Sequence, residues 1–177
     1  LALCIIEDAV QRGVLHKQSI ILECTSGNTG ISLAMVGAAL GYRVHILMSE
    51  SASIERRHLI RQFGGEVELF KPTNGYATGI ELSLEMAGRD PNIFLPRQFE
   101  NPINARDHEE FTGREILSQM EGRVDAFVAG YGTGGTLTGC GRALRAANPK
   151  VRILAMEPAE AAMLSGEMPC CHSIEGV

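Results

Sequence analysis

Short apolar segments alternate with segments of helical spacing along most of the chain, and this alternation constrains the fold more than any other feature. The strand-like segments are 20–22, 43–48, 67–69, 93–95, 124–129 and 151–156, and the helix-like segments are 1–12, 31–41, 53–63, 79–87, 107–120 and 135–147. Strands that are separated by helices pair in parallel, because a parallel connection has to cross the sheet. The pattern therefore predicts an α/β fold with mostly parallel, twisted sheets and helices on both faces.

Two of these segments allow finer predictions. In the 43–48 strand, alternate apolar side chains are expected on one buried face, namely Val44, Ile46 and Met48. In the 53–63 helix we expect Ile54, Leu59, Ile60 and Phe63 to face inward and Arg56, Arg57 and Arg61 to face outward.

One boundary is visible at an extended segment bracketed by prolines, from Pro96 to Pro102. It predicts a boundary between an N-terminal α/β half at 1–102 and a second half at 103–177.

Composition and charge exclude several classes of protein. The 177 residues have 45% hydrophobic content and a net charge of −5, which argues against nucleic acid as the main partner. The longest apolar stretch, near 30–40, is too short to span a membrane, and Leu1–Ile6 lacks the basic leader of a signal peptide. Five cysteines without a C-x-x-C pair predict reduced thiols in the cytoplasm, and Cys170-Cys171-His172 lacks the second ligand pair of a metal site.

The six residues Thr25–Gly30 join a predicted strand to a predicted helix. The first N–H groups of a helix have no intrahelical partner and carry partial positive charge, so they favour a carboxylate or phosphate. Three hydroxyls and one carboxamide in this turn exceed what a helix cap needs. The turn is therefore predicted to bind an anion, with a generously capped core helix as the alternative.

A second turn of this kind, Gly130–Thr136, follows the predicted strand 124–129. Its glycines let backbone N–H groups approach an anion closely, so a phosphate is the expected ligand. Because Gly130, Gly132 and Gly135 also fit G-x-G-x-x-G, with Glu157 after the next strand, a dinucleotide-binding module remains an alternative. The extra threonines and the late place of the loop count against it.

Four motifs, in order, resemble the cysteine synthase (O-acetylserine sulfhydrylase) and cystathionine β-synthase family of fold-type II pyridoxal-phosphate enzymes. They are the Thr25–Gly30 loop, Glu55-Arg56-Arg57 with Phe63-Gly64, Gln98-Phe99 with Asn101-Pro102, and the Gly132–Thr136 loop. Glu157-Pro158 with Leu164-Ser165-Gly166 also matches. The resemblance implies two α/β domains of the tryptophan synthase β-like type, truncated at both ends. The N-terminal domain at 1–102 would be the smaller one, with a mobile part at about 44–90, and 103–177 would be part of a larger domain that binds the cofactor phosphate.

The resemblance also implies roles for individual residues. The substrate-binding residues would be Thr25, Ser26, Gly27, Asn28, Thr29, Gln98 and Gly176, and the cofactor-binding residues would be Asn28, Gly132, Thr133, Gly134, Gly135 and Thr136. No metal ligand is implied. The Schiff-base lysine of the family lies just ahead of a helix like 1–12, so the resemblance would place it a few residues before Leu1. The lysines of this sequence are poor candidates, because Lys17 and Lys150 precede strands and Lys71 lies in a turn that is expected to be exposed. The sequence is thus expected to be the middle of a longer enzyme and to be inactive alone.

The implied activity of that enzyme is the formation of L-cysteine from O-acetylserine and sulfide with pyridoxal 5'-phosphate. Its partners would be a small amino-acid substrate, a sulfur nucleophile, a second copy in a homodimer and, in some relatives, serine acetyltransferase. Three alternatives remain open: a cystathionine β-synthase-type β-replacement, a non-catalytic member of the fold, and the dinucleotide-binding module.

Overall fold

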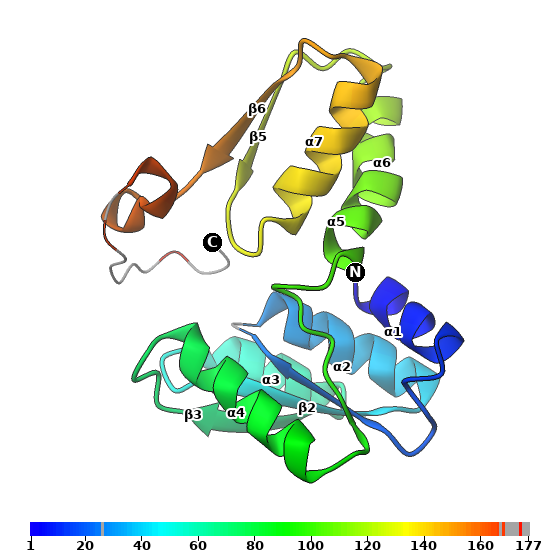
Figure 1. The fold of residues 1–177 in the computed structure, drawn as a ribbon, viewed down its shortest axis with the longest axis vertical. Coiled ribbons are helices and arrows are strands. Elements are labelled where there is room, and N and C mark those ends of the chain that lie inside the picture. The colour runs from blue at the N-terminus through cyan, green and yellow to red at the C-terminus, as the bar shows by residue number, and fades with distance from the viewer. Residues whose placement is uncertain (26, 167, 169–173, 175–177) are drawn as a thin grey trace. The chain divides into compact units, whose positions relative to one another are not determined.

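The computed structural model describes residues 1–25, 27–166, 168 and 174 of the chain. The chain divides into two compact units, Leu1–Gln98 and Phe99–Val177 (Figure 1). The division lies within the proline-bracketed segment, four residues before the position 102 at which the sequence suggests a boundary.

The first unit is a parallel sheet with helical connections. Its elements are α1 (Ala2–Gln11), β1 (Ile20–Cys24), α2 (Asn28–Leu40), β2 (Arg43–Ser49), α3 (Ile54–Gln62), β3 (Glu66–Phe70), α4 (Tyr76–Arg89) and β4 (Ile93–Phe94). The strand order is β3-β2-β1-β4, and every described pair in this sheet is parallel. The predicted α/β class and parallel pairing are confirmed.

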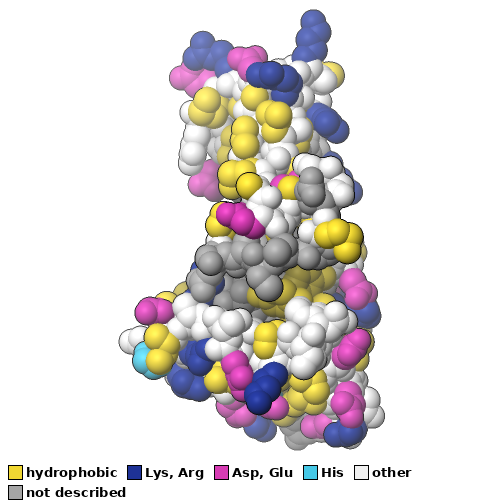
Figure 2. Space-filling view, turned by 90° about the vertical axis from the view of Figure 1, so that its left-hand side faces the viewer, with side chains coloured by type: hydrophobic (Ala, Val, Ile, Leu, Met, Phe, Trp, Pro, Cys, Tyr) yellow, Lys and Arg dark blue, Asp and Glu magenta, His cyan; other side chains and the backbone are white. Residues whose placement is uncertain are grey.

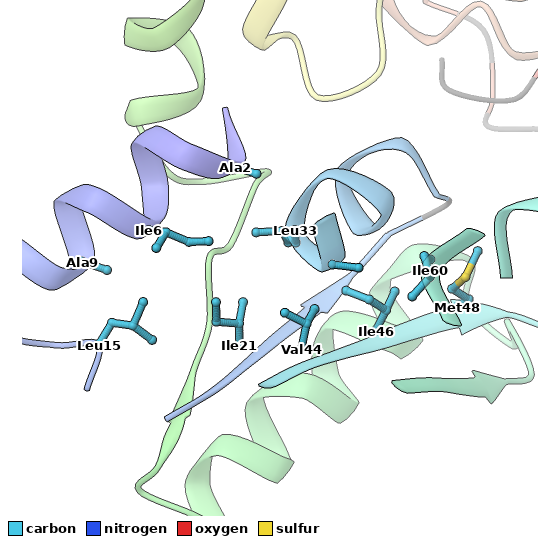
Figure 3. Packing of buried hydrophobic residues seen from close by; sticks show 11 residues of the cluster. Ala2, Ile6, Ala9, Leu15, Ile21, Leu33, Val44, Ile46, Met48 and Ile60 are labelled. Atoms are coloured by element: carbon cyan, nitrogen blue, oxygen red, sulfur yellow. The ribbon is translucent and has the colours of Figure 1, made fainter. Parts of the chain in front are cut away.

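Two hydrophobic clusters cover the two faces of this sheet. On one face, residues of α1, α2 and α3 pack against Val44, Ile46 and Met48 of β2 (Figure 3). On the other face, Leu47 of β2 and Phe70 of β3 lie in a cluster lined by residues of α4. The predicted shared face of Val44, Ile46 and Met48 is confirmed. Helices bury the sheet from both sides, as parallel sheets require.

The predicted inward face of α3 is partly wrong. Ile60 is fully buried, but Ile54 and Leu59 are 56% and 42% exposed. Arg57 is half-buried and donates to the carbonyl oxygens of Glu50 and Ala52, both at 2.6 Å. The reason is geometric: the inward line of the helix runs through positions 56, 57, 60 and 63, so residues 54 and 59 fall beside it.

The second unit has a smaller sheet and a packed helical layer. Its elements are α5 (Ile103–Asp107), a π-helical segment (His108–Thr112), α6 (Gly113–Gln119), β5 (Ala126–Gly130), α7 (Gly135–Ala147), β6 (Arg152–Met156) and two 3₁₀ turns (Ala159–Ala161 and Met163–Ser165). β5 and β6 pair in parallel, and Val124, Leu144 and Val151 form the buried cluster. The single helix expected over 107–120 is therefore interrupted. π-helical turns of this kind are frequent at functional sites.

The surface carries charge of both signs. On the face drawn in Figure 2, Lys and Arg side chains are interspersed with Asp and Glu side chains. Among the described residues, no helix is both long enough and apolar enough to cross a membrane.

Candidate functional site

The turn between β1 and α2 is shaped by its own polar groups. Thr25 is buried, and its Oγ1 accepts a hydrogen bond from the N–H of Gly27 at 3.2 Å. Gly27, at the N-cap, has φ of +149°, a conformation that L side chains rarely adopt. Asn28 begins α2 and has an exposed side chain. The helix start therefore presents unpaired N–H groups next to an accessible carboxamide.

Gln98 is hydrogen-bonded to this turn although it lies 69 residues after Thr29 in the chain. Its Nε2 donates to the carbonyl oxygen of Cys24 at 3.1 Å, and its Oε1 accepts from the hydroxyl of Thr29 at 2.6 Å. Its side chain is buried, with 5% exposure. The structure thus brings together two of the predicted substrate residues, Thr29 and Gln98, which the sequence places in separate motifs.

Glu23 is a buried acid next to this turn, and sequence reasoning missed it. Its carboxylate accepts from the backbone N–H of Cys24 at 3.0 Å and from that of Gln98 at 3.1 Å. Burial raises the pKa of Glu23 from 4.5 to about 7, although these N–H groups act in the opposite direction. The signal in the sequence was an acidic residue inside an otherwise apolar strand.

Arg56 of α3 lies against the same turn. A Cβ added at Gly27 would come within 2.2 Å of the Arg56 Cδ and 3.1 Å of its Nε. The lack of a side chain at Gly27 therefore makes room for an arginine next to the α2 N-terminus. The sequence suggested a family motif here but no role for this residue.

The second predicted loop joins β5 to α7. Gly134 is the N-cap of α7, with φ of +78° in the left-handed region, and α7 is 13 residues long. Gly132 and Thr133 are exposed, Thr136 is half-buried and Gly135 is buried. A Cβ at Gly135 would lie 2.1 Å from Asn104 Oδ1, so the helix start packs directly on that side chain.

Two side chains from the preceding helical segment contact the hydroxyls of this loop. Asn104 Nδ2 donates to Thr133 Oγ1 at 2.8 Å. His108 Nε2 lies 3.2 Å from Thr136 Oγ1, and His108 Nδ1 lies 3.0 Å from Thr112 Oγ1. Sequence reasoning missed both residues: Asn104 lies between the proline-bracketed segment and the 107–120 segment, and His108 belongs to a segment that was treated as an ordinary helix.

The loop fits a phosphate group. Two threonine hydroxyls, glycine N–H groups and the N-terminus of α7 can all donate hydrogen bonds to the oxygens of a phosphate. Glu157, the acid considered for a dinucleotide ribose, is bonded within its own unit: its carboxylate accepts from the N–H groups of Leu164 and Ser165 and from the Ser165 hydroxyl, at 2.7, 3.0 and 2.8 Å.

Several remaining predictions concern residues at or beyond the limits of the described chain. Lys17, Lys71 and Lys150 are exposed, as expected for Lys71. Ser26, Gly176 and the Cys170-Cys171-His172 run lie outside the described residues. Within the part of the chain that is described, no cluster of three or more His, Cys, Asp or Glu side chains could hold a metal ion.

Comparisons with known proteins identify the family. A family model described as pyridoxal-phosphate dependent enzyme matches residues 1–174. A cysteine synthase from Flavobacterium sp. is 43% identical over 177 residues, which is 100% of this chain and 58% of that protein. An O-ureido-L-serine synthase from Streptomyces lavendulae is 47% identical over 178 residues, which is 100% of this chain and 55% of that protein.

Solved structures agree with these relatives. The O-acetylserine dependent cystathionine β-synthase from Helicobacter pylori matches with a TM-score of 0.95 at 32% identity, covering 99% of this chain and 57% of that one. The chain therefore spans a little more than half the length of the relatives it matches. Since the match extends over nearly all of its residues, the chain belongs to the pyridoxal-phosphate dependent enzymes, with the fold-type II architecture and pyridoxal phosphate as the cofactor of its family.

Proposed function

We propose that the protein carrying this chain forms L-cysteine from O-acetylserine and sulfide by β-replacement. The observation that carries the proposal is a pair of loops, each joining a parallel strand to a helix N-terminus, with the groups that a carboxylate and a phosphate need. The cysteine synthase relative supports this choice of reaction.

The Gly132–Thr136 loop is proposed to hold the cofactor phosphate. Pyridoxal phosphate, when bound, supplies an electron sink that makes the α-proton of an amino acid removable and its β-substituent able to leave. The residues proposed to contact it are Asn28, Gly132, Thr133, Gly134, Gly135 and Thr136. The family match and the bonded carboxylate of Glu157 leave the dinucleotide alternative without support.

The β1–α2 turn is proposed to hold the substrate. The N-terminus of α2 would bind the amino-acid carboxylate, and the exposed Asn28 carboxamide would contact cofactor and substrate. Gln98, hydrogen-bonded to Thr29, would complete this surface. The further substrate residues proposed are Thr25, Ser26, Gly27 and, near the end of the chain, Gly176.

The wider organisation is proposed from the family resemblance. We infer a smaller N-terminal domain with a part near 44–90 that moves on substrate binding, and a larger cofactor-phosphate-binding domain that includes 103–177. Free Cys4, Cys24 and Cys140 support a cytoplasmic protein. A homodimer that binds serine acetyltransferase is the assembly we propose.

A spectroscopic experiment on the complete protein tests the proposal. Lys17, Lys71 and Lys150 are exposed and are not proposed to hold the cofactor. From the family resemblance we propose that the lysine that holds it lies just before Leu1. We expect a visible absorption band that borohydride removes, with the label mapped to that lysine, and L-cysteine formed from O-acetylserine and sulfide. A protein without this band and without a labelled lysine would be a non-catalytic member of the fold.

A β-replacement with another nucleophile is the second candidate. The 47% identity to an O-ureido-L-serine synthase and the fold shared with a cystathionine β-synthase favour it. Product analysis by mass spectrometry with O-acetylserine and either sulfide, homocysteine or hydroxyurea separates the candidates. Preferential formation of cystathionine or O-ureido-L-serine would replace cysteine as the assigned product.

Asn28→Ala tests the substrate loop. Loss of the carboxamide is expected to lower kcat/KM of the complete enzyme by roughly tenfold to a hundredfold, because one oriented polar contact at the reacting centre is removed. Asn74→Ala, an exposed asparagine in the turn before α4, is the matched control. Unchanged steady-state kinetics in Asn28→Ala would remove this residue from the site.

A further inference from the structure

The two threonine hydroxyls of the Gly132–Thr136 loop contact side chains of another segment, Asn104 and His108. Asn104 is buried, with 4% exposure, and belongs to α5, while His108 begins the π-helical segment. Neither lies in the loop, and the sequence motifs give neither a role. Their hydrogen bonds decide where the hydroxyl protons of the loop can point.

For Thr133, the direction of the hydroxyl proton follows from the number of groups that donate to its oxygen. A hydroxyl has one proton and two acceptor lone pairs. Thr133 Oγ1 accepts from Asn104 Nδ2 at 2.8 Å, and the N–H of Gly135 approaches it at 3.4 Å. An amide nitrogen only donates, so these two contacts use the oxygen as an acceptor. The Thr133 proton is left for an acceptor outside this pair, and a bound phosphate is such a group.

For Thr136 the direction depends on the tautomer of His108. Burial lowers the pKa of His108 from its ordinary value of 6.5, with Asp107 acting in the opposite direction, so the ring is neutral near pH 7. A neutral imidazole donates from one nitrogen and accepts at the other. If Nε2 carries the proton, it donates to Thr136 and Nδ1 accepts from Thr112. If Nδ1 carries it, the Thr136 proton is used on the ring.

A bound phosphate distinguishes these arrangements. Its oxygens only accept, so binding favours the tautomer in which the Thr136 proton is free to turn toward it. The packing fixes the backbone from which the ring extends: a Cβ at Gly139 of α7 would lie 2.7 Å from His108 Cβ and 2.1 Å from the Ala105 carbonyl oxygen. The helix backbone thus approaches closely the segment that carries both side chains.

We propose that Asn104 and His108 are positioning residues that donate to Thr133 and Thr136 and thereby turn both hydroxyl protons toward the cofactor phosphate. The assignment rests on the proposed phosphate-binding role of the Gly132–Thr136 loop. It adds that His108 is in its Nε2–H tautomer when the cofactor is bound.

A double-mutant cycle on the complete protein tests the Asn104 half. The dissociation constant of pyridoxal 5'-phosphate is measured by titrating the cofactor-free protein. Asn104→Ala and Thr133→Val are each expected to raise it by roughly tenfold or more, since each removes a hydrogen bond that supports a charged group. The double variant is expected to bind no more weakly than Thr133→Val alone. Effects that multiply would show that Asn104 acts elsewhere and would overturn the assignment.

A pair of substitutions tests His108, and it remains informative if Asn104→Ala does not fold. His108→Gln places an N–H donor near the position of Nε2, whereas His108→Asn reaches only the position of Nδ1. We expect His108→Gln to keep the cofactor affinity within about threefold and His108→Asn to weaken it by roughly tenfold. Glu110→Gln, exposed in the same segment, is the control. Equal affinity in both His108 variants would overturn the assignment.

The tautomer itself is read by ¹⁵N NMR of histidine-labelled protein. The cofactor-loaded protein is expected to show a protonated Nε2 and an unprotonated Nδ1 for His108, and the opposite pattern would contradict the assignment. The outcomes also separate this inference from the proposed reaction. A protein that responds to these variants but forms no cysteine keeps the assignment and loses the reaction. If instead the protein forms cysteine but every variant binds the cofactor as tightly as the wild type, the proposed reaction stands and the assignment of Asn104 and His108 is wrong.

Discussion

A single acidic side chain, Glu23, connects strand β1 to the segment that ends the first unit. Its carboxylate accepts from the N–H of Gln98, whose own side chain is bonded to Cys24 and Thr29. The position of Gln98 in the proposed substrate surface therefore depends on the buried carboxylate of Glu23. Burial is what makes this group respond to pH, because it penalises the charged carboxylate.

The stability of the protein is expected to depend on pH through Glu23. Because its pKa rises from 4.5 to about 7 on folding, the folded state binds this proton more tightly than the unfolded chain does. The stabilisation is complete below pH 4.5 and is lost as the pH rises through 7. We measure the free energy of unfolding of the wild type and of Glu23→Gln by urea denaturation at several pH values. The wild-type value minus the variant value should fall by at most about 3 kcal/mol as the pH rises across this range.

Glu81→Gln, an exposed change on α4, is the matched control for this titration. The difference in free energy of unfolding between the wild type and Glu81→Gln should stay nearly constant over the same pH range. A wild-type minus Glu23→Gln difference that rises with pH would contradict the assigned direction of the Glu23 pKa.

At the scale of elements, glycines set how closely helices approach their neighbours. A Cβ at Gly79 of α4 would lie 2.3 Å from Cys24 Sγ of β1 and 2.6 Å from the ring of Phe70 of β3. At Gly88, near the other end of the same helix, no described atom beyond the adjoining residues and the backbone of the helix itself lies within 4 Å of the added Cβ. In α4, therefore, close packing requires a glycine at position 79 but not at position 88.

The same substitution is expected to have opposite effects at these two positions. Gly79→Ala should lower the free energy of unfolding by about 1–3 kcal/mol, because the core beside it is already filled. Gly88→Ala should leave it unchanged or raise it by up to about 1 kcal/mol, since alanine favours the helix. Urea midpoints of the two variants provide the comparison, and equal midpoints would show that the contacts at Gly79 relax freely.

At the scale of the whole molecule, the buried residues form separate cores in the two units. Ile46 belongs to the cluster of the first unit, and Leu144 to that of the second, and both are fully buried. Each core is built from the strands and helices of its own unit. The two units are therefore expected to lose protection from hydrogen exchange separately.

A pair of core truncations tests this independence. Ile46→Ala and Leu144→Ala should each cost about 2–5 kcal/mol of stability. Hydrogen-exchange mass spectrometry should find faster exchange mainly in 1–98 for the first variant and mainly in 99–177 for the second. Loss of protection over both ranges in either variant would show that the cores unfold as one.

The sequence by itself determined the α/β class, the parallel pairing and the places of the two strand-to-helix turns that we propose to bind anions. These features depend on local properties, namely apolar periodicity, glycine positions and hydroxyls at a strand end. For the same reason the alternation in β2 predicted correctly that Val44, Ile46 and Met48 share a buried face.

Only the tertiary structure decided which distant groups meet. Glu23 and Gln98 are separated by 75 residues, and Asn104 and Thr133 by 29. The inward line of α3 and the π-helical turn at His108 likewise depend on the elements packed against them. Local propensity does not encode such contacts, because their energy comes from burial and hydrogen bonds that exist only after the chain has folded.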